Sequence, residues 1–135
     1  MSVATFKEIE SLEKASMELL EMDNIRHVAV INKLGRIVAG RFKPGINRYL
    51  DDEKVRMVYM QMMLDLRMRQ ELDETLGPID YIISKRKKIT IISVPTEHYL
   101  VMVSAERVID SDKVVKRAEE LFDIIDLRWY SCIQT

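Results

Sequence analysis

The architecture expected for this chain follows from one stretch, VRMVYMQMMLDLRM, which runs from Val55 to Met68. Its apolar residues recur at helical spacing, about 100° per residue, but on two roughly opposite sides. The first stripe consists of Val55, Val58, Tyr59, Met62 and Leu66, and the second consists of Met57, Met60, Leu64 and Met68. A helix that only covers a sheet needs one apolar face. The second stripe therefore predicts a further partner, and the simplest one is another copy of the same helix.

The helix around this stretch is expected to run from Asp51 to Leu76. Acidic residues at its start suit the positive end of the helix dipole, and Gly77-Pro78 is a strong stop signal. Apolar spacings of three and four residues predict two more helices, from Val3 to Met22 and from Ser111 to Leu127, the latter with Asp110 or Ser111 as N-cap. The apolar stripe of the first of these consists of Phe6, Ile9, Leu12, Ala15, Leu19 and Leu20.

Runs rich in β-forming residues flank the long helix in the sequence. Before it, His27–Ile31 and Arg36–Phe42 form a hairpin around the turn Asn32–Gly35, where the glycine can take a positive φ. After it come three strands joined by short turns: Ile79–Ser84, Ile89–Val94 and Tyr99–Ala105. These connections predict an α+β fold with a five-stranded, mainly antiparallel sheet in the order 2-1-5-4-3. The long helix would cover one face of this sheet and the two terminal helices the other.

Length and composition indicate one globular domain that spans residues 1–135. Apolar residues make up 47% and charged residues 32% of the chain, as is usual for a soluble protein. The 21 basic and 22 acidic residues nearly cancel, so the chain lacks the field of a dedicated nucleic-acid binder. Nucleic acid is therefore not expected as a partner.

Cysteine content and the N-terminal sequence favour a cytoplasmic location. Cys132 is the only cysteine, so an internal disulfide is excluded and a reducing compartment is expected. The N-terminal sequence has no basic segment followed by an apolar core. No apolar stretch approaches the roughly 20 residues of a membrane span, so we expect none.

Residue patterns that would carry catalysis are absent from the sequence. His27 and His98 have no metal-ligand spacing to other His, Cys or acidic residues, so surface or capping roles are expected, with pH sensing as the alternative. The glycines form neither a phosphate-binding loop nor a dinucleotide fingerprint, and no serine stands in a G-x-S-x-G turn. We therefore expect no catalytic residue, no metal and no cofactor, and a protein that is not an enzyme.

Positively charged residues gather at two places where a partner could bind. The tip of the second predicted hairpin carries Lys85, Arg86, Lys87 and Lys88, and the first hairpin is flanked by Arg36, Arg41, Lys43 and Arg48. Such residues could contact phosphates or a protein partner. The alternative for the hairpin tip is a solvated turn that discourages edge-to-edge aggregation.

The order of the elements resembles that of roadblock/LC7 domains, a group of the profilin-like folds related to longin domains. The resemblance extends from about Val3 to Leu127, and it is carried by the hairpin His27–Gly40 and the strand Tyr99–Val103. In roadblock domains, the second helix and an edge strand pair two copies into a continuous sheet. The resemblance thus implies a dimer interface at Met57, Met60, Leu64 and Met68. The chain is also similar to small archaeal proteins, a similarity that implies no function.

The expected function is a non-enzymatic, homodimeric interaction or scaffold module. The roadblock resemblance implies small GTPases or other signalling proteins as partners. The alternative is a PAS- or GAF-like sensory domain, which would hold a small ligand beside the Met-rich helix. Trp129-Tyr130, after the last predicted helix, could anchor the C-terminal tail or bind a partner.

Overall fold

Five strands form one antiparallel sheet in the order β2-β1-β5-β4-β3, which confirms the expected topology. The structure is a computed structural model that describes the backbone of residues 5–134 and the side chains of residues 5–123. The strands are β1 (Ile25–Ile31), β2 (Ile37–Phe42), β3 (Ile82–Lys85), β4 (Ile89–Pro95) and β5 (Leu100–Glu106). The helices are α1 (Phe6–Leu20), α2 (Asp52–Gln70), α3 (Asp73–Leu76) and α4 (Ser111–Gln134).

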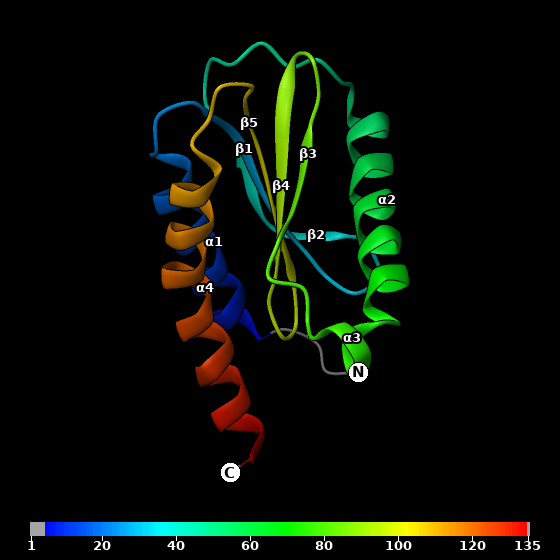
Figure 1. Cartoon of the computed structure of the whole chain (residues 1–135). Helices are drawn as coiled ribbons and strands as arrows, with labels where there is room; N and C mark the ends of the chain where they lie inside the picture. The colour runs from blue at the N-terminus through cyan, green and yellow to red at the C-terminus, as the bar shows by residue number, and fades with distance from the viewer. Residues whose placement is uncertain (1–4, 135) are drawn as a thin grey trace.

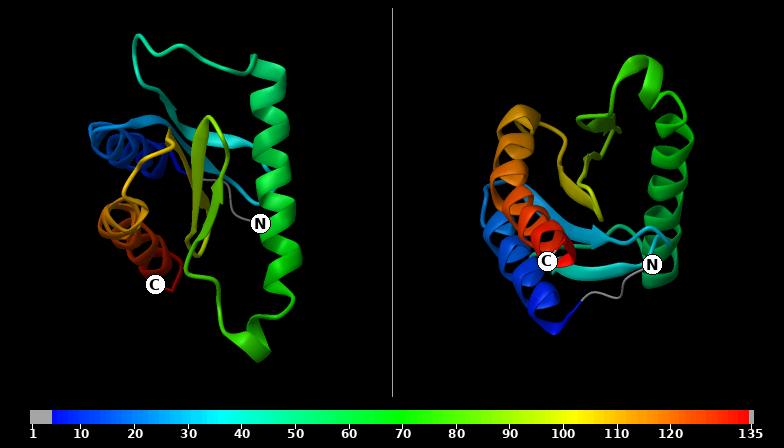
Figure 2. Two further views of the ribbon diagram at one scale, coloured as in Figure 1. Left: turned by 45° about the horizontal axis from the view of Figure 1, so that its top comes forward. Right: turned by 90° about the horizontal axis from the view of Figure 1, so that it is seen from below.

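Helices cover both faces of the sheet, as Figures 1 and 2 show. The two terminal helices, α1 and α4, lie together on one face, and α2 lies on the other. On the first face, Leu12 of α1 and Phe122 of α4 are buried in the larger core. On the second, Tyr59, Met63 and Leu66 of α2 are buried in a smaller core. The expected layering of the fold is therefore confirmed.

The inner side of α2 confirms the first apolar stripe and adds one residue to it. Tyr59 and Leu66 are buried, and the partly buried members of the stripe are Val55, Val58 and Met62. Met63, which the predicted stripe did not include, is only 6% exposed. The sheet therefore covers a broader arc of the helix than the helical period alone indicated.

The predicted helix from Asp51 to Leu76 is wrong in its C-terminal part. After α2 ends at Gln70, α3 forms a separate single turn. Leu72, between the two helices, has φ −99° and ψ 7°, and its N–H donates to the carbonyl of Arg69 at 3.2 Å. Residues 67–72 are all exposed, so packing against the sheet does not extend the helix through this segment.

The first helix is shorter than predicted at both ends. Thr5 is its N-cap, and the Thr5 hydroxyl accepts a hydrogen bond from the N–H of Glu8 at 3.2 Å. Phe6, which was expected on the apolar stripe, is 83% exposed because the fully buried positions of α1 begin only at Leu12. The predicted first residues of this helix, 3 and 4, lie outside the described residues.

The last helix is longer than predicted and continues to Gln134. The N–H of Lys113 donates to the Asp110 carboxylate at 3.3 Å, which identifies Asp110 as the N-cap. Trp129-Tyr130 and Cys132 therefore stand on helical backbone rather than in a tail. Their side chains lie outside the described residues, so the roles considered for them stay predictions.

Candidate functional site

Four exposed apolar side chains of α2 form what we name the outer stripe: Met57, Met60, Leu64 and Met68. Their exposed fractions are 53%, 53%, 60% and 71%, whereas Tyr59 and Leu66 on the inner side are each 3% exposed. A single helix of this chain thus presents one apolar side to the sheet and a second to solvent. Contiguous exposed apolar surface of this kind marks interaction sites more often than scattered exposed residues do.

The turn between β1 and β2 packs against the flank of the outer stripe. Gly35 has φ +78°, and a Cβ at this position would lie 3.0 Å from the Cα of Met60. Only glycine combines this backbone conformation with so close an approach to the helix. Arg67 of α2 also donates a hydrogen bond to the carbonyl of Lys33 at 3.3 Å. The turn that precedes Arg36 is thereby held beside α2.

His27 is buried in β1, so the surface or capping role expected for it is wrong. Its ring stacks on that of Phe42 with centroids 3.8 Å apart, and its Nε2 lies 2.8 Å from the hydroxyl of Tyr59 on α2. The guanidinium of Arg48 lies 4.0 Å from the centre of the Phe42 ring. Burial, aided by the charge of Arg48, lowers the pKa of His27 to about 4. A neutral imidazole therefore connects β1, β2 and α2.

The same burial acts on the phenol that contacts the imidazole. Desolvation raises the pKa of Tyr59, so its hydroxyl stays protonated at neutral pH. The hydroxyl can then donate to an unprotonated Nε2, which holds α2 to the sheet through one polar contact within an apolar layer. This pair has the geometry of a structural hydrogen bond rather than of a site open to substrate.

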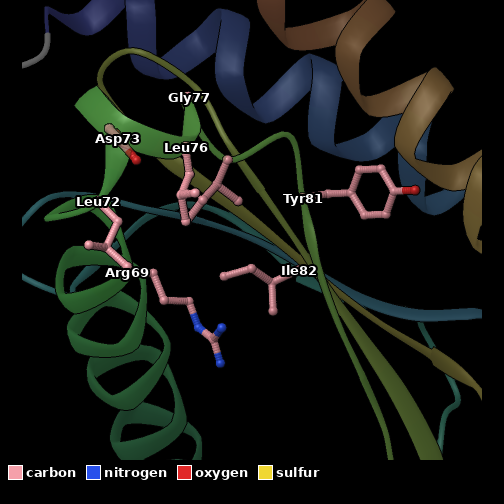
Figure 3. A pocket seen from close by; sticks show the side chains of 8 residues that line it. Arg69, Leu72, Asp73, Leu76, Gly77, Tyr81 and Ile82 are labelled. Carbon is pink, nitrogen blue, oxygen red and sulfur yellow. The ribbon is translucent and has the colours of Figure 1, made fainter.

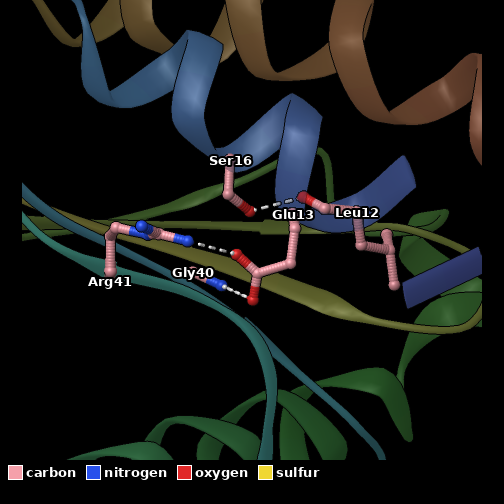
Figure 4. A network of polar contacts seen from close by, with 5 residues as sticks. All are labelled: Leu12, Glu13, Ser16, Gly40 and Arg41. Carbon is pink, nitrogen blue, oxygen red and sulfur yellow. Dashed lines mark hydrogen bonds and ion pairs between the residues drawn. The ribbon is translucent and has the colours of Figure 1, made fainter. Parts of the chain in front are cut away.

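The candidate basic residues do not form one continuous surface. Arg36 and Arg41 lie along the β2 edge of the sheet, whereas Lys85–Lys88 lie at the β3–β4 hairpin on the opposite edge. Arg41 pairs with the carboxylate of Glu13 on α1 at 3.2 Å, and the same carboxylate accepts from the N–H of Gly40 at 3.2 Å (Figure 4). Arg41 is therefore directed to the α1 face of the sheet.

The other two cations near the first hairpin also have partners within the chain. The Lys43 ammonium donates to the carbonyl of Met22 at 3.0 Å. Arg48 forms an ion pair with Asp52 at 2.7 Å in addition to its contact with Phe42. Both side chains therefore support local structure.

A groove of about 700 Å³ lies between α2 and the β3–β4 hairpin, and we name it the basic groove. Its apolar lining consists of Leu50, Val58, Met62, Ile89 and Ile91. Its charged lining consists of Lys85, Arg86, Lys87, Lys88 and Arg107. Tyr49 and Gln61 complete the lining, which contains no acidic residue. From the sequence, only the four consecutive cations of this lining were expected to contact a charged partner. The other lining residues come from segments far apart in the chain, so no local pattern connects them.

A smaller hollow of about 350 Å³ lies where α2 ends, beside α3 and the start of β3 (Figure 3). Leu72 and Leu76 line it and are 56% and 76% exposed. Arg69, also in its lining, forms an ion pair with Asp65 at 3.2 Å. The apolar surface of α2 thus continues past the outer stripe toward α3.

Among the described residues, no three His, Cys, Asp or Glu side chains are placed to hold a metal ion. No helix in the described part of the chain has the length and apolar character needed to cross a membrane.

The fold is that of roadblock/LC7 domains, within the profilin-like group. A roadblock/LC7 domain from Streptomyces avermitilis superimposes with a TM-score of 0.69 at 9% identity, over 88% of this chain and 98% of that one. MglB from Myxococcus xanthus gives a TM-score of 0.75 at 12% identity, over 96% of each chain. Profilin from Schizosaccharomyces pombe gives 0.58 at 16% identity, over 84% of this chain and 95% of that one. The resemblance inferred from element order is confirmed at the level of the fold.

The chain belongs to DUF6659, described as a family of unknown function, whose sequence profile matches residues 3–129. Among curated proteins, none matches the chain in sequence. The function is therefore inferred from the surfaces of the molecule.

Proposed function

We propose that two copies of this chain pair through the outer stripe of α2 and form a non-enzymatic interaction module. The observation that carries this proposal is the exposure of the outer stripe on a helix whose inner side already packs on the sheet. Apolar surface removed from water stabilises an association by about 25 cal/mol per Å² before the cost of association is subtracted. A line of four apolar side chains favours a partner that presents a matching apolar line.

A second copy of the chain is the simplest such partner, because a two-fold axis places the same surface on both sides of the contact. β3 supports this arrangement, since it is an edge strand that pairs only with β4. Tyr81 and Ile83, before and within this strand, are 39% and 41% exposed. The roadblock resemblance implies pairing through the second helix and an edge strand, and we propose α2 and β3 for these roles.

We further propose a small GTPase or another signalling protein as the partner of the dimer. The support is the roadblock/LC7 fold and the exposure of Arg36 and Lys85–Lys88 as candidate contacts. Arg41 belongs to the same predicted surface, but a partner would have to compete with Glu13 for it. An interaction module of this kind needs no catalytic residue.

The dimer is tested by the double variant Met60→Glu/Leu64→Glu, examined by light scattering on a size-exclusion column. Two carboxylates within the outer stripe would have to be desolvated in the interface, so we expect a folded monomer where the native chain is a dimer. Met17→Glu is the matched control, because Met17 of α1 is 48% exposed and lies outside the stripe. A native chain that is monomeric, or a double variant that stays dimeric, would contradict the proposed interface.

The GTPase is tested with purified small GTPases of the source organism, loaded with GDP or with a non-hydrolysable GTP analogue. We expect at least tenfold tighter binding of one nucleotide state. Equal binding of both states, or none, would remove the GTPase from the proposal and leave the dimer as a separate question.

The sensory alternative has one observation in its favour. The basic groove is a concave site beside α2 of a size that suits a small molecule. It lies at the flank of the helix, because Tyr59, Met63 and Leu66 fill the space between the middle of α2 and the sheet.

A further inference from the structure

We propose that the basic groove binds a small amphipathic anion: a free molecule with an unbranched apolar chain that ends in a carboxylate or phosphate. This inference goes beyond the interaction module: the groove lies on the flank of α2 rather than on its outer stripe, and it assigns Lys85–Lys88, proposed above as contacts for a protein partner, to a small ligand. Three observations support it: the residue types in the lining, the volume of the groove, and the cations that lie against its one aromatic ring, Tyr49.

The charge of the groove selects an anionic ligand. Lys85–Lys88 and Arg107 contribute five cations to the lining, and no acidic residue balances them there. The arrangement depends on the fold, because the hydroxyl of Thr90 donates to the carbonyl of Arg107 at 3.1 Å and holds it beside β4. Cations clustered at a concave surface raise the local concentration of anions.

The apolar part of the lining selects a ligand with a hydrocarbon portion. Val58 and Met62 come from α2, and Ile89 and Ile91 come from β4. Ile89 and Ile91 alternate with Thr90 along the strand, so both side chains lie on the sheet face that α2 covers. Val58, Met62 and Ile89 are only partly buried in the smaller core, and a bare inorganic anion would leave their exposed parts in water.

The aromatic residue of the lining argues against a nucleotide. Tyr49 already lies 4.5 Å from the guanidinium of Arg26 and 5.4 Å from the ammonium of Lys88, measured to the ring centre. A cation held against a ring competes with a base for the face on which the base would stack. Apart from the amide of Gln61, the remaining uncharged side chains of the lining are aliphatic or thioether groups, which suit a flexible hydrocarbon chain. The volume of about 700 Å³ lies within the range of small-molecule sites, roughly 300–1,000 Å³.

The test is isothermal titration calorimetry of the full chain with dodecanoate below its critical micelle concentration. Dodecylamine has the same chain with the opposite charge, and hexanoate has the same charge with a shorter chain. We expect dodecanoate to bind at least tenfold more tightly than either, and dodecyl phosphate to bind as well as dodecanoate. If dodecylamine bound as tightly as dodecanoate, the groove would not select an anion. If hexanoate bound as tightly as dodecanoate, the groove would not select a long hydrocarbon.

Two charge-reversal variants locate the site. Lys85→Glu/Lys87→Glu should weaken dodecanoate binding at least tenfold, whereas Lys113→Glu/Lys116→Glu, on exposed positions of α4, should leave it unchanged. Circular dichroism of both variants verifies that they are folded. Equal losses in the two variants would assign the effect to net charge and overturn the site.

Two additional measurements distinguish the basic groove from the outer stripe and a small ligand from a larger partner. The variant Met60→Glu/Leu64→Glu should retain dodecanoate binding, because the outer stripe does not line the groove. Loss of binding in that variant would mean that the hydrocarbon of the ligand contacts the outer stripe. That result would overturn the proposed ligand site and would leave the proposed dimer as a separate question. Tight binding of a poly-glutamate peptide or of phosphatidylglycerol vesicles, without binding of dodecanoate, would contradict a small-molecule ligand. It would indicate an acidic protein segment or a membrane surface as the ligand instead.

Discussion

The two faces of the sheet differ in what they place at their surfaces. The face covered by α1 and α4 carries the larger apolar core, and its ion pair between Glu13 and Arg41 lies at the periphery. The face covered by α2 carries a smaller core, a buried His27–Tyr59 hydrogen bond, the outer stripe and the basic groove. This difference indicates that one face mainly stabilises the fold, while the other also supplies the surfaces available for recognition.

The largest loss of stability is expected from the α1–α4 face. Phe122 of α4 is 2% exposed, so Phe122→Ala should lower the free energy of unfolding by about 3–5 kcal/mol through lost burial and a cavity. Urea denaturation followed by circular dichroism measures this change. Leu64→Ala on the outer stripe serves as the comparison, with a loss below about 0.5 kcal/mol at concentrations where the chain is monomeric. Similar losses of stability at the two positions would contradict the proposed difference between the buried core and the outer stripe.

The α2 face should show a specific dependence of stability on pH. The pKa of His27 is about 4 in the folded chain against 6.5 for an ordinary histidine. The unfolded chain therefore binds the proton first, so this contribution to stability is complete above pH 6.5 and is lost as the pH falls toward 4. A shift of this size corresponds to a loss of about 3 kcal/mol.

Denaturation of the native chain and of His27→Gln over pH 4–7 isolates this contribution. The glutamine can still contact the Tyr59 hydroxyl but does not titrate, so the difference between the two chains should shrink as the pH falls. A constant difference across this range would show that His27 is not held neutral by burial.

The hydrogen bond between α2 and the sheet should contribute a smaller amount. Tyr59→Phe removes the hydroxyl and leaves the buried Nε2 of His27 without that partner, so a loss of about 1–3 kcal/mol is expected. Tyr81→Phe, at a tyrosine that is 39% exposed, should change the stability by less than about 0.5 kcal/mol. Equal losses of stability in the two variants would mean that the buried hydrogen bond makes no net contribution to stability.

The smallest effect is expected from the polar contacts at the α1 periphery. Glu13→Ala removes the ion pair with Arg41 and the acceptor of the Gly40 N–H, contacts that are partly open to water. A loss of about 0.5–1 kcal/mol is expected, reduced at high salt. A loss comparable to that of Phe122→Ala would contradict the assignment of these contacts to the periphery.

Sequence patterns predicted elements well where many residues repeat one period. The topology of the sheet and the two sides of α2 followed from apolar spacing and from short connections. Errors arose where one residue departed from its neighbours. His27 stands in a run that becomes a fully buried strand, but a histidine by itself gives no sign that Phe42 will stack on it or that Tyr59 will reach it.

The candidate sites also differ in how much of them the sequence predicted. The outer stripe lies on one helix, so its spacing was visible and its residues stand together in the structure. The basic cations were visible as residue types, but Arg41 turns to Glu13 while Lys85–Lys88 join Arg107 around a groove. Contacts between distant segments leave no local period, so the sequence did not predict which residues line the groove.

Local regularities of the chain thus account for the α+β class, the strand order and the line of apolar residues on the outer side of α2. Tertiary packing decided where α2 ends, that Met63 and His27 are buried, and that a hairpin tip becomes one wall of the basic groove. The physical reason is the range of the interactions. Helical and strand periods depend on neighbours a few residues apart, whereas burial, pKa shifts and clustered charge depend on residues that meet only after the sheet has formed.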